Sequence, residues 1–114
     1  MRAQSILEST GIPTYPGVWR ETEEYTQPPE AYIVHTQMRI ESFHTDDQTE
    51  EFRIFDYANL WTIKDPSELA ARVREAMYAG GWGMAEEFTE YDEDAKRFRV
   101  SWTWTTLEGF ADAV

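Results

Sequence analysis

Hydrophobic and polar side chains alternate along much of this chain, which is the pattern of strands that bury one face. The clearest alternation covers residues 97–106, where Trp102 and Trp104 share a parity with a phenylalanine and a valine. Arginine, serine and threonine occupy the other parity. Residues 31–42 alternate in the same way. We therefore expect half-buried strands at about 31–42 and 96–106.

Weaker strand patterns occupy three further segments. Residues 52–64 are rich in aromatic and β-branched side chains, but their alternation is imperfect. This strand is either covered on both faces or shifted in phase by a bulge. Residues 82–91 are a candidate strand that a turn at 92–95 joins to the last one. An extended segment near Tyr15 is interrupted by the turn-forming pair Pro16-Gly17.

A helix of about 66–80 has the clearest boundaries in the sequence. Asp65 can cap it, Pro66 suits its first position, and Glu68 completes a capping box. Its apolar residues recur at helical spacing, and Gly80-Gly81 ends it. The residues on that apolar face are Leu69, Val73, Ala76, Met77 and Gly80.

The elements together predict an α+β fold in a single domain, residues 1–114. A short helix at residues 2–9 ends before Gly11 and Pro13, and it is too short to be stable without docking. Short connections favour antiparallel pairing. We expect a mainly antiparallel sheet of about four strands, with the long helix on one face. The other face must meet solvent, the N-terminal helix or another copy of the chain.

The net charge of the chain limits the classes of partner that we expect it to bind. Ten basic and 22 acidic residues give a net charge of −12, which opposes binding to nucleic-acid phosphates and to anionic membranes. Acidic residues gather at 20–30 and 44–51, which we expect to be exposed loops, the second closing a hairpin. The N-terminus lacks the pattern of a signal peptide and no apolar run is long enough to span a bilayer. We expect a protein used inside a cell or in a particle assembled there.

The sequence offers no convincing catalytic, cofactor or metal site. It has no cysteine, so thiol catalysis and thiolate ligands are excluded. The two histidines, His35 and His44, are better explained as ordinary surface histidines than as a metal pair. The acidic run at 92–94 lacks the glycine and closing glutamate of a calcium loop. We expect no enzymatic activity.

Five tryptophans are many for a chain of 114 residues. Tryptophan buries a large area and is enriched at interfaces. We expect Trp102 and Trp104 to line the core against the helix rather than to form a platform for a sugar or peptide. We expect at least one of the others to contact a neighbouring subunit; these are Trp19, Trp61 and Trp82.

The order of several short motifs resembles a known family of structural proteins. The motifs are Gly11-Ile12-Pro13, Pro29-Glu30-Ala31-Tyr32-Ile33-Val34, Asp65-Pro66-Ser67-Glu68-Leu69, Gly81-Trp82 and Tyr91-Asp92. Over about residues 5–107 the chain is similar to the tail-completion, or tail-terminator, proteins of long-tailed bacteriophages and prophages, the lambda-type minor tail protein U group. Two features depart from that family: the first helix is short, and residues 44–51 are unusually acidic.

The resemblance implies a structural role in the virion tail, assembled in the host cytoplasm. It implies a hexameric ring that caps the tail tube, stops its polymerisation and meets the head-side connector protein. It implies no catalytic residues, cofactor or metal. A neighbouring head–tail connector component, and a carbohydrate- or peptide-binding module using exposed tryptophans, are the alternatives.

Two charged groups are candidates for contacts in such a ring. An acidic loop would suit a channel lining that does not hold DNA phosphates; its residues are Asp46, Asp47, Glu50 and Glu51. On the polar parity of the last strand, Arg97 and Arg99 form a basic patch on an acidic chain. We expect this patch to contact the acidic edge of a neighbouring subunit.

Overall fold

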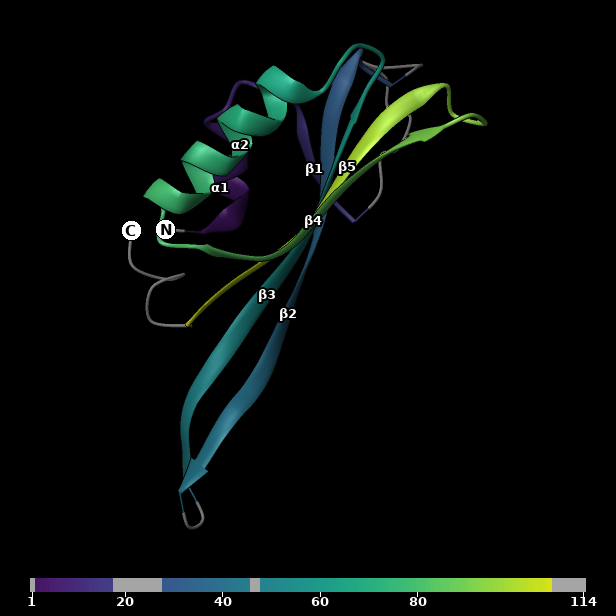
Figure 1. The fold of residues 1–114 in the computed structure, drawn as a ribbon. Helices are drawn as coiled ribbons and strands as arrows, with labels where there is room; N and C mark the ends of the chain where they lie inside the picture. The colour runs from purple at the N-terminus through teal and green to yellow at the C-terminus, as the bar shows by residue number, and fades with distance from the viewer. Residues whose placement is uncertain (1, 18–27, 46–47, 108–114) are drawn as a thin grey trace.

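The chain forms an α+β fold in which one five-stranded sheet packs against two helices (Figure 1). The computed structural model describes residues 2–17, 28–45 and 48–107, with the backbone alone over 41–45 and 48–52. The elements, in chain order, are α1 (Ala3–Glu8), β1 (Thr14–Pro16), β2 (Ala31–Thr45), β3 (Gln48–Thr62), α2 (Ser67–Ala79), β4 (Gly83–Asp92) and β5 (Arg97–Leu107).

The sheet has the order β1-β2-β3-β5-β4, so it contains one strand more than the expected four. The fifth is β1, which is three residues long and pairs parallel with β2. The other three pairings are antiparallel, so the expectation of a mainly antiparallel sheet is confirmed. α2 connects β3 to β4 and passes over β5, which fills the position between them.

The acidic segment 44–51 is strand rather than loop over most of its length, so this prediction was wrong. β2 runs to Thr45 and β3 starts at Gln48, with shifts in register near Phe43. Polar composition misled the prediction because polar residues on both parities leave no apolar alternation that would indicate a strand. The connection at 46–47 lies outside the described residues.

The hairpin of β2 and β3 extends beyond the rest of the sheet (Figure 1). β5 pairs with β3 only between Arg53 and Thr62, so over 41–45 and 48–52 these two strands pair with each other alone. We call this two-stranded ribbon the arm. An isolated two-stranded ribbon is marginally stable in water, so the arm gains from a further partner.

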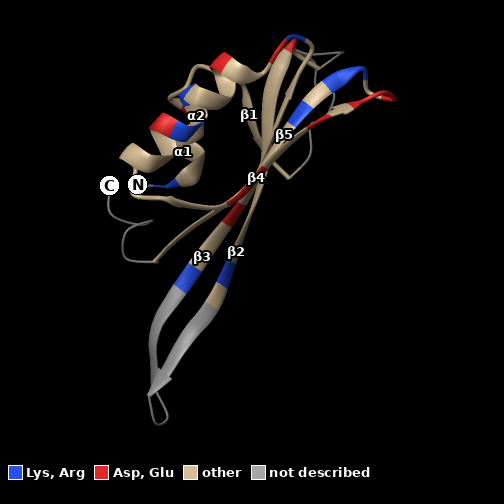
Figure 2. Ribbon diagram, in the orientation of Figure 1, with Lys and Arg blue, Asp and Glu red and all other residues tan. Residues whose placement is uncertain are grey.

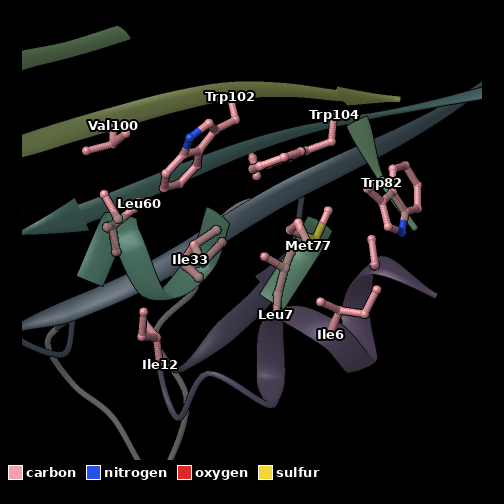
Figure 3. Packing of buried hydrophobic residues seen from close by; sticks show 14 of the residues in the cluster. Ile6, Leu7, Ile12, Ile33, Leu60, Met77, Trp82, Val100, Trp102 and Trp104 are labelled. Carbon is pink, nitrogen blue, oxygen red and sulfur yellow. The ribbon is translucent and has the colours of Figure 1, made fainter. Parts of the chain in front are cut away.

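The core lies between the helices and one face of the sheet, which we call the inner face (Figure 3). Trp102 and Trp104 are 2% and 0% exposed, and they share the core with Val73 and Met77 of α2. The expectation that these tryptophans line the core is confirmed. α1 adds Ile6 and Leu7, which explains how a helix of only 6 residues is held.

α2 ends at the glycine pair expected from the sequence. It starts at Ser67, with Pro66 as its N-cap residue, and Glu68 pairs with Arg72, so the expected capping box was wrong. At the start, the Asp65 carboxylate accepts a hydrogen bond of 2.8 Å from the Ser67 N–H. At the end, Gly81 has φ of 92° and the Trp82 N–H donates to the Met77 carbonyl at 3.0 Å. This is a Schellman motif, which places the residue after the glycine against the last turn of the helix. It therefore directs Trp82 into the core.

A row of three hydrogen-bonded polar side chains connects α1 to the sheet. His35 Nδ1 lies 2.8 Å from Asp56 Oδ2 on β3, and His35 Nε2 contacts Gln4 Oε1 on α1. Gln4 Nε2 donates to Glu8 and to the Thr14 carbonyl, so the Gln4 oxygen faces the imidazole and accepts. Both ring nitrogens of His35 therefore have a hydrogen-bond partner. At 7% exposure His35 is buried, so the expectation of a surface histidine was wrong at this position.

Replacing Gly81 tests the helix-ending motif. Gly81→Ala should lower the free energy of unfolding by about 1–2 kcal/mol, because an L-residue is strained in the left-handed region. A Cβ there would meet no atom within 4 Å, so the cost is conformational. Gly83→Ala is the control, since its Cβ would make only an ordinary contact with Thr105. Urea unfolding measures both, and equal stabilities would contradict the assignment.

Replacing His35 tests the buried pair. His35→Ala should lower the free energy of unfolding by about 1–3 kcal/mol, because the fully buried Asp56 carboxyl would lose its hydrogen-bond partner. Gln4→Ala removes the contact with His35 together with the hydrogen bonds to Glu8 and to the Thr14 carbonyl, and it should cost roughly 1–2 kcal/mol because these groups are only partly buried. Urea denaturation at neutral pH gives both values. A decrease of less than 1 kcal/mol in the free energy of unfolding of His35→Ala would show that the contact between His35 and Asp56 contributes little to stability.

Candidate assembly surface

The face of the sheet opposite the helices carries most of the exposed large hydrophobic side chains. We call it the outer face. Met38 is 48% exposed, Tyr57 39% and Phe88 45%, and they come from three different strands. Ile40 is exposed on the same face, and Ile63, which directly follows β3, is exposed as well. In the described part of the chain, the remaining exposed large hydrophobics are Tyr78 on α2 and Tyr91.

Strand register explains why these side chains gather. Met38 of β2 lies opposite Phe55 of β3, and Tyr32 lies opposite Trp61. Phe55 and Tyr57, two residues apart on β3, stack with ring centroids 6.4 Å apart. Because successive residues of a strand point to opposite faces, a strand that is apolar on both parities must present one set outward. The irregular alternation of residues 52–64 is therefore explained by a sheet with two apolar faces.

A shallow groove of about 210 Å³ crosses the outer face. Ser101 and Thr103 of β5 form its floor, and the larger side chains of Tyr57 and Phe88 line it on the neighbouring strands. Small residues on the middle strand make the depression, while aromatic residues on both sides raise its walls. Such a groove fits an apolar side chain or an extended segment of another protein chain.

The two arginines of β5 contribute to this surface in a way that the sequence did not reveal. Arg99 lies over the rings of Trp61 and Phe88, at 5.5 and 5.8 Å from their centroids, and pairs with Glu90. It therefore joins β3, β5 and β4 across the outer face. Cation–π contacts of this kind favour a fixed guanidinium position.

Arg97 is held in a similar way at the end of the sheet. It lies 5.3 Å from the Tyr32 ring centroid and donates to the carbonyls of Pro29 and Glu30, at 2.9 and 2.7 Å. Both arginines are therefore engaged within the chain, so they do not form a free basic patch. Their role in a contact with a neighbouring subunit stays a prediction, and reversing their charge would also disturb the sheet.

The other residues expected at an interface have different positions. Trp61 is half-buried on the outer face beneath Arg99. Trp82 is 3% exposed and belongs to the core, so it offers almost no surface to a neighbour. Trp19 lies outside the described residues, as do Asp46 and Asp47. Positions 50 and 51 belong to β3, but their side chains lie outside the described part.

The alternative of a sugar- or peptide-binding platform on Trp102 and Trp104 is contradicted by the structure. Both rings are buried beneath α2, and the Trp102 indole N–H donates to Glu87. A platform needs exposed ring faces, so this pair cannot supply one. The sequence did indicate this burial, because Trp102 and Trp104 share their parity with Val100, as expected of residues on a core face.

The described residues offer little else that could perform chemistry. Among them, no group of three or more histidine, aspartate or glutamate side chains is placed to hold a metal ion. None of the helices in the described part is long and apolar enough to cross a membrane. A hollow of about 450 Å³ near the start of α2 is lined by Pro13, Thr62 and Leu69, among others, and it is open to solvent.

Comparison with known proteins adds no relative on which to base a function. No protein-family model matches the chain. No curated protein matches its sequence.

The contact between Arg97 and Tyr32 has a measurable consequence. Burial raises the pKa of the Tyr32 phenol, and the positive charge of Arg97 partly offsets that rise. Arg97→Gln should therefore raise the pKa of Tyr32 further. Alkaline titration of tyrosinate absorbance measures this, with Tyr32→Phe in each background isolating the signal of Tyr32. An unchanged or lower pKa in Arg97→Gln would show that the guanidinium does not lie over this ring.

Proposed function

We propose that this chain is a structural subunit that assembles through the outer face of its sheet into a ring that completes a bacteriophage tail. The observation that carries the assembly part is the exposed apolar surface around Met38, Tyr57 and Phe88. Contiguous apolar patches spanning several strands are typical of interaction sites rather than of free surface. Aromatic residues and arginine, both present here, are enriched in the centres of protein interfaces.

The tail-completion role rests on the resemblance of the motif order, from Gly11-Ile12-Pro13 through Asp65-Pro66-Ser67-Glu68-Leu69 to Tyr91-Asp92. In this role the ring caps the end of the tail tube, stops tube growth and meets the head-side connector protein. The chain works in the virion tail after assembly in the host cytoplasm. It catalyses no reaction and needs no cofactor.

A ring sets a requirement that the outer face can meet. Cyclic assembly beyond a dimer uses heterologous contacts, in which one surface of each subunit binds a different surface of the next. A stable contact buries roughly 800 Å² on each partner. The outer face belongs to a sheet of five strands, and its groove between Tyr57 and Phe88 provides a concave centre for such a contact.

The acidic end of the arm has a proposed place in the same assembly. Positions 46 and 47 connect β2 to β3, positions 50 and 51 belong to β3, and all four are acidic. Facing the channel, they would repel DNA phosphates and let the genome pass without being held. Their side chains lie outside the described residues, so this placement follows from sequence and strand order.

Electron microscopy of the purified chain with a tail-tube protein tests the proposal. The wild type should form rings alone or at tube ends, and tubes capped by it should stop growing. Phe88→Glu should abolish ring formation, because it places a charge in the centre of the contact. Ala71→Glu, which adds the same charge to the exposed side of α2, should leave rings intact.

Far-ultraviolet circular dichroism should show that both variants are folded. Rings that persist in Phe88→Glu would contradict assembly through the outer face. A wild type that neither forms rings nor limits tube growth would contradict the tail-completion role itself.

A further inference from the structure

The outer face is the one extensive apolar surface among the described residues. Met38, Tyr57 and Phe88 are exposed on it, from three different strands. Tyr78 stands on α2, and Tyr91 lies on the inner-face parity of β4, so each is separate from this surface. Burial of apolar area against apolar area is the main driving force of association. A second copy of the chain therefore offers one matching surface in its described part, which is the same outer face.

The charges on the outer face balance, although the chain as a whole is strongly acidic. The described side chains of this parity on β3, β5 and β4 include three arginines and three acidic residues. They are Arg53, Arg97, Arg99, Glu86, Glu90 and Asp92. All three arginines bind groups of their own chain, so no unpaired positive charge has to be buried.

The excess negative charge therefore lies away from the centre of the outer face. The net charge of the chain is −12, and Figure 2 shows acidic residues on the helices and in the turn after β4. Two copies that meet through their outer faces keep these residues on their far sides or at the rim. Water and salt screen charges at such separations, so the contact avoids most of the repulsion between two acidic chains.

The relief of the outer face fits a second outer face. Ser101 and Thr103 of β5 form the floor of the groove, and Tyr57 of β3 stands beside it. The strand order places β3 and β5 between β2 and β4. A two-fold axis parallel to the strands, between β3 and β5, lays the β3 of one copy over the β5 of the other. Tyr57 of each copy then lies over the groove of the other, and Phe88 lies over β2.

The size of the face is sufficient for a stable dimer. Adjacent strands lie about 4.8 Å apart and each residue adds about 3.3 Å, so four strands of about nine residues span roughly 20 by 30 Å. Side chains roughen this surface, and its accessible area approaches the roughly 800 Å² that each partner buries in a stable complex. Sheets that pack face to face in this way form the core of a sandwich.

We propose that two copies of the free chain pair outer face to outer face about a two-fold axis between β3 and β5. The contact is isologous, so it closes at two copies and cannot by itself build a ring. The dimer goes beyond the proposed function, because it is a state of the chain away from the tail tube. Since the proposed ring uses the same face, dimer and ring compete for it.

Sedimentation of the free chain tests the dimer. The mass should rise to twice that of the monomer with increasing concentration and stop there. Phe88→Glu should raise the dissociation constant roughly a hundredfold, because it buries a charge in the contact. Ala71→Glu adds the same charge on the exposed side of α2 and should leave the constant unchanged. Monomers at every concentration up to about 100 µM would overturn the inference, as would species that grow beyond the dimer.

Single cysteines distinguish a two-fold contact from a heterologous one, because the natural chain contains no cysteine. Packed sheets lie about 10 Å apart. Thr103→Cys and Ser101→Cys are close to the proposed axis, so a bismaleimide of that length should join each to its own copy. Ala71→Cys, on the helical layer, should stay monomeric. Absence of cross-linked dimers from both β5 variants, or equal cross-linking of Ala71→Cys, would overturn the two-fold arrangement.

The result is separable from the proposed function. Rings on tail tubes from a chain that is monomeric when free would leave the tail-completion role standing and remove the dimer. A two-fold dimer of a chain that does not act on tail tubes would establish this contact and remove the role.

Discussion

The structure depends on the packing of one layer of helices against one face of a five-stranded sheet. α1 and α2 cover the inner face, where Trp102, Trp104 and Trp82 fill the space between helix and sheet. At about 25 cal/mol per Å² of apolar surface, burying such rings is the largest favourable contribution available to a chain of this size. Two helices of 6 and 13 residues cannot cover both faces, and neither of these described helices lies on the outer face.

The polar contacts follow from this arrangement. On the inner face, His35 and Asp56 form a buried pair that reaches Gln4 and so fixes the short helix α1 to the sheet. On the outer face, Arg99 and Arg97 lie over aromatic rings of neighbouring strands. The first set defines where the helices dock. The second covers part of an apolar surface with charge while leaving Tyr57 and Phe88 exposed.

Much of the fold could be predicted because its signals are local. The alternation in residues 97–106 identifies the core face, and Asp65 and Gly81 mark the ends of α2 through capping geometry that needs no tertiary context. β1 and the arm were missed because three residues carry too little pattern, and a ribbon with polar residues on both parities shows none. The pairing of β1 also depends on residues 33–35, which lie outside its own segment of sequence.

The candidate surface was harder to predict for a physical reason. Residues 52–64 are apolar on both parities. Their register with β5 decides which parity faces the helices, and composition does not. Trp82 was expected at an interface because tryptophan is common there, but the Schellman motif directs it inward. Arg97 and Arg99 were correctly placed on the polar parity of their strand, but their aromatic contacts arise from β2, β3 and β4.

The most direct test of the outer face as an interface is covalent footprinting of the assembled and the dispersed chain. Labelling of Met38, Tyr57 and Phe88 should fall severalfold on assembly, while Tyr78, exposed on the helical layer, should be labelled equally in both states. Equal labelling of the three outer-face residues in both states, or protection of Tyr78 alone, would show that assembly uses a different surface.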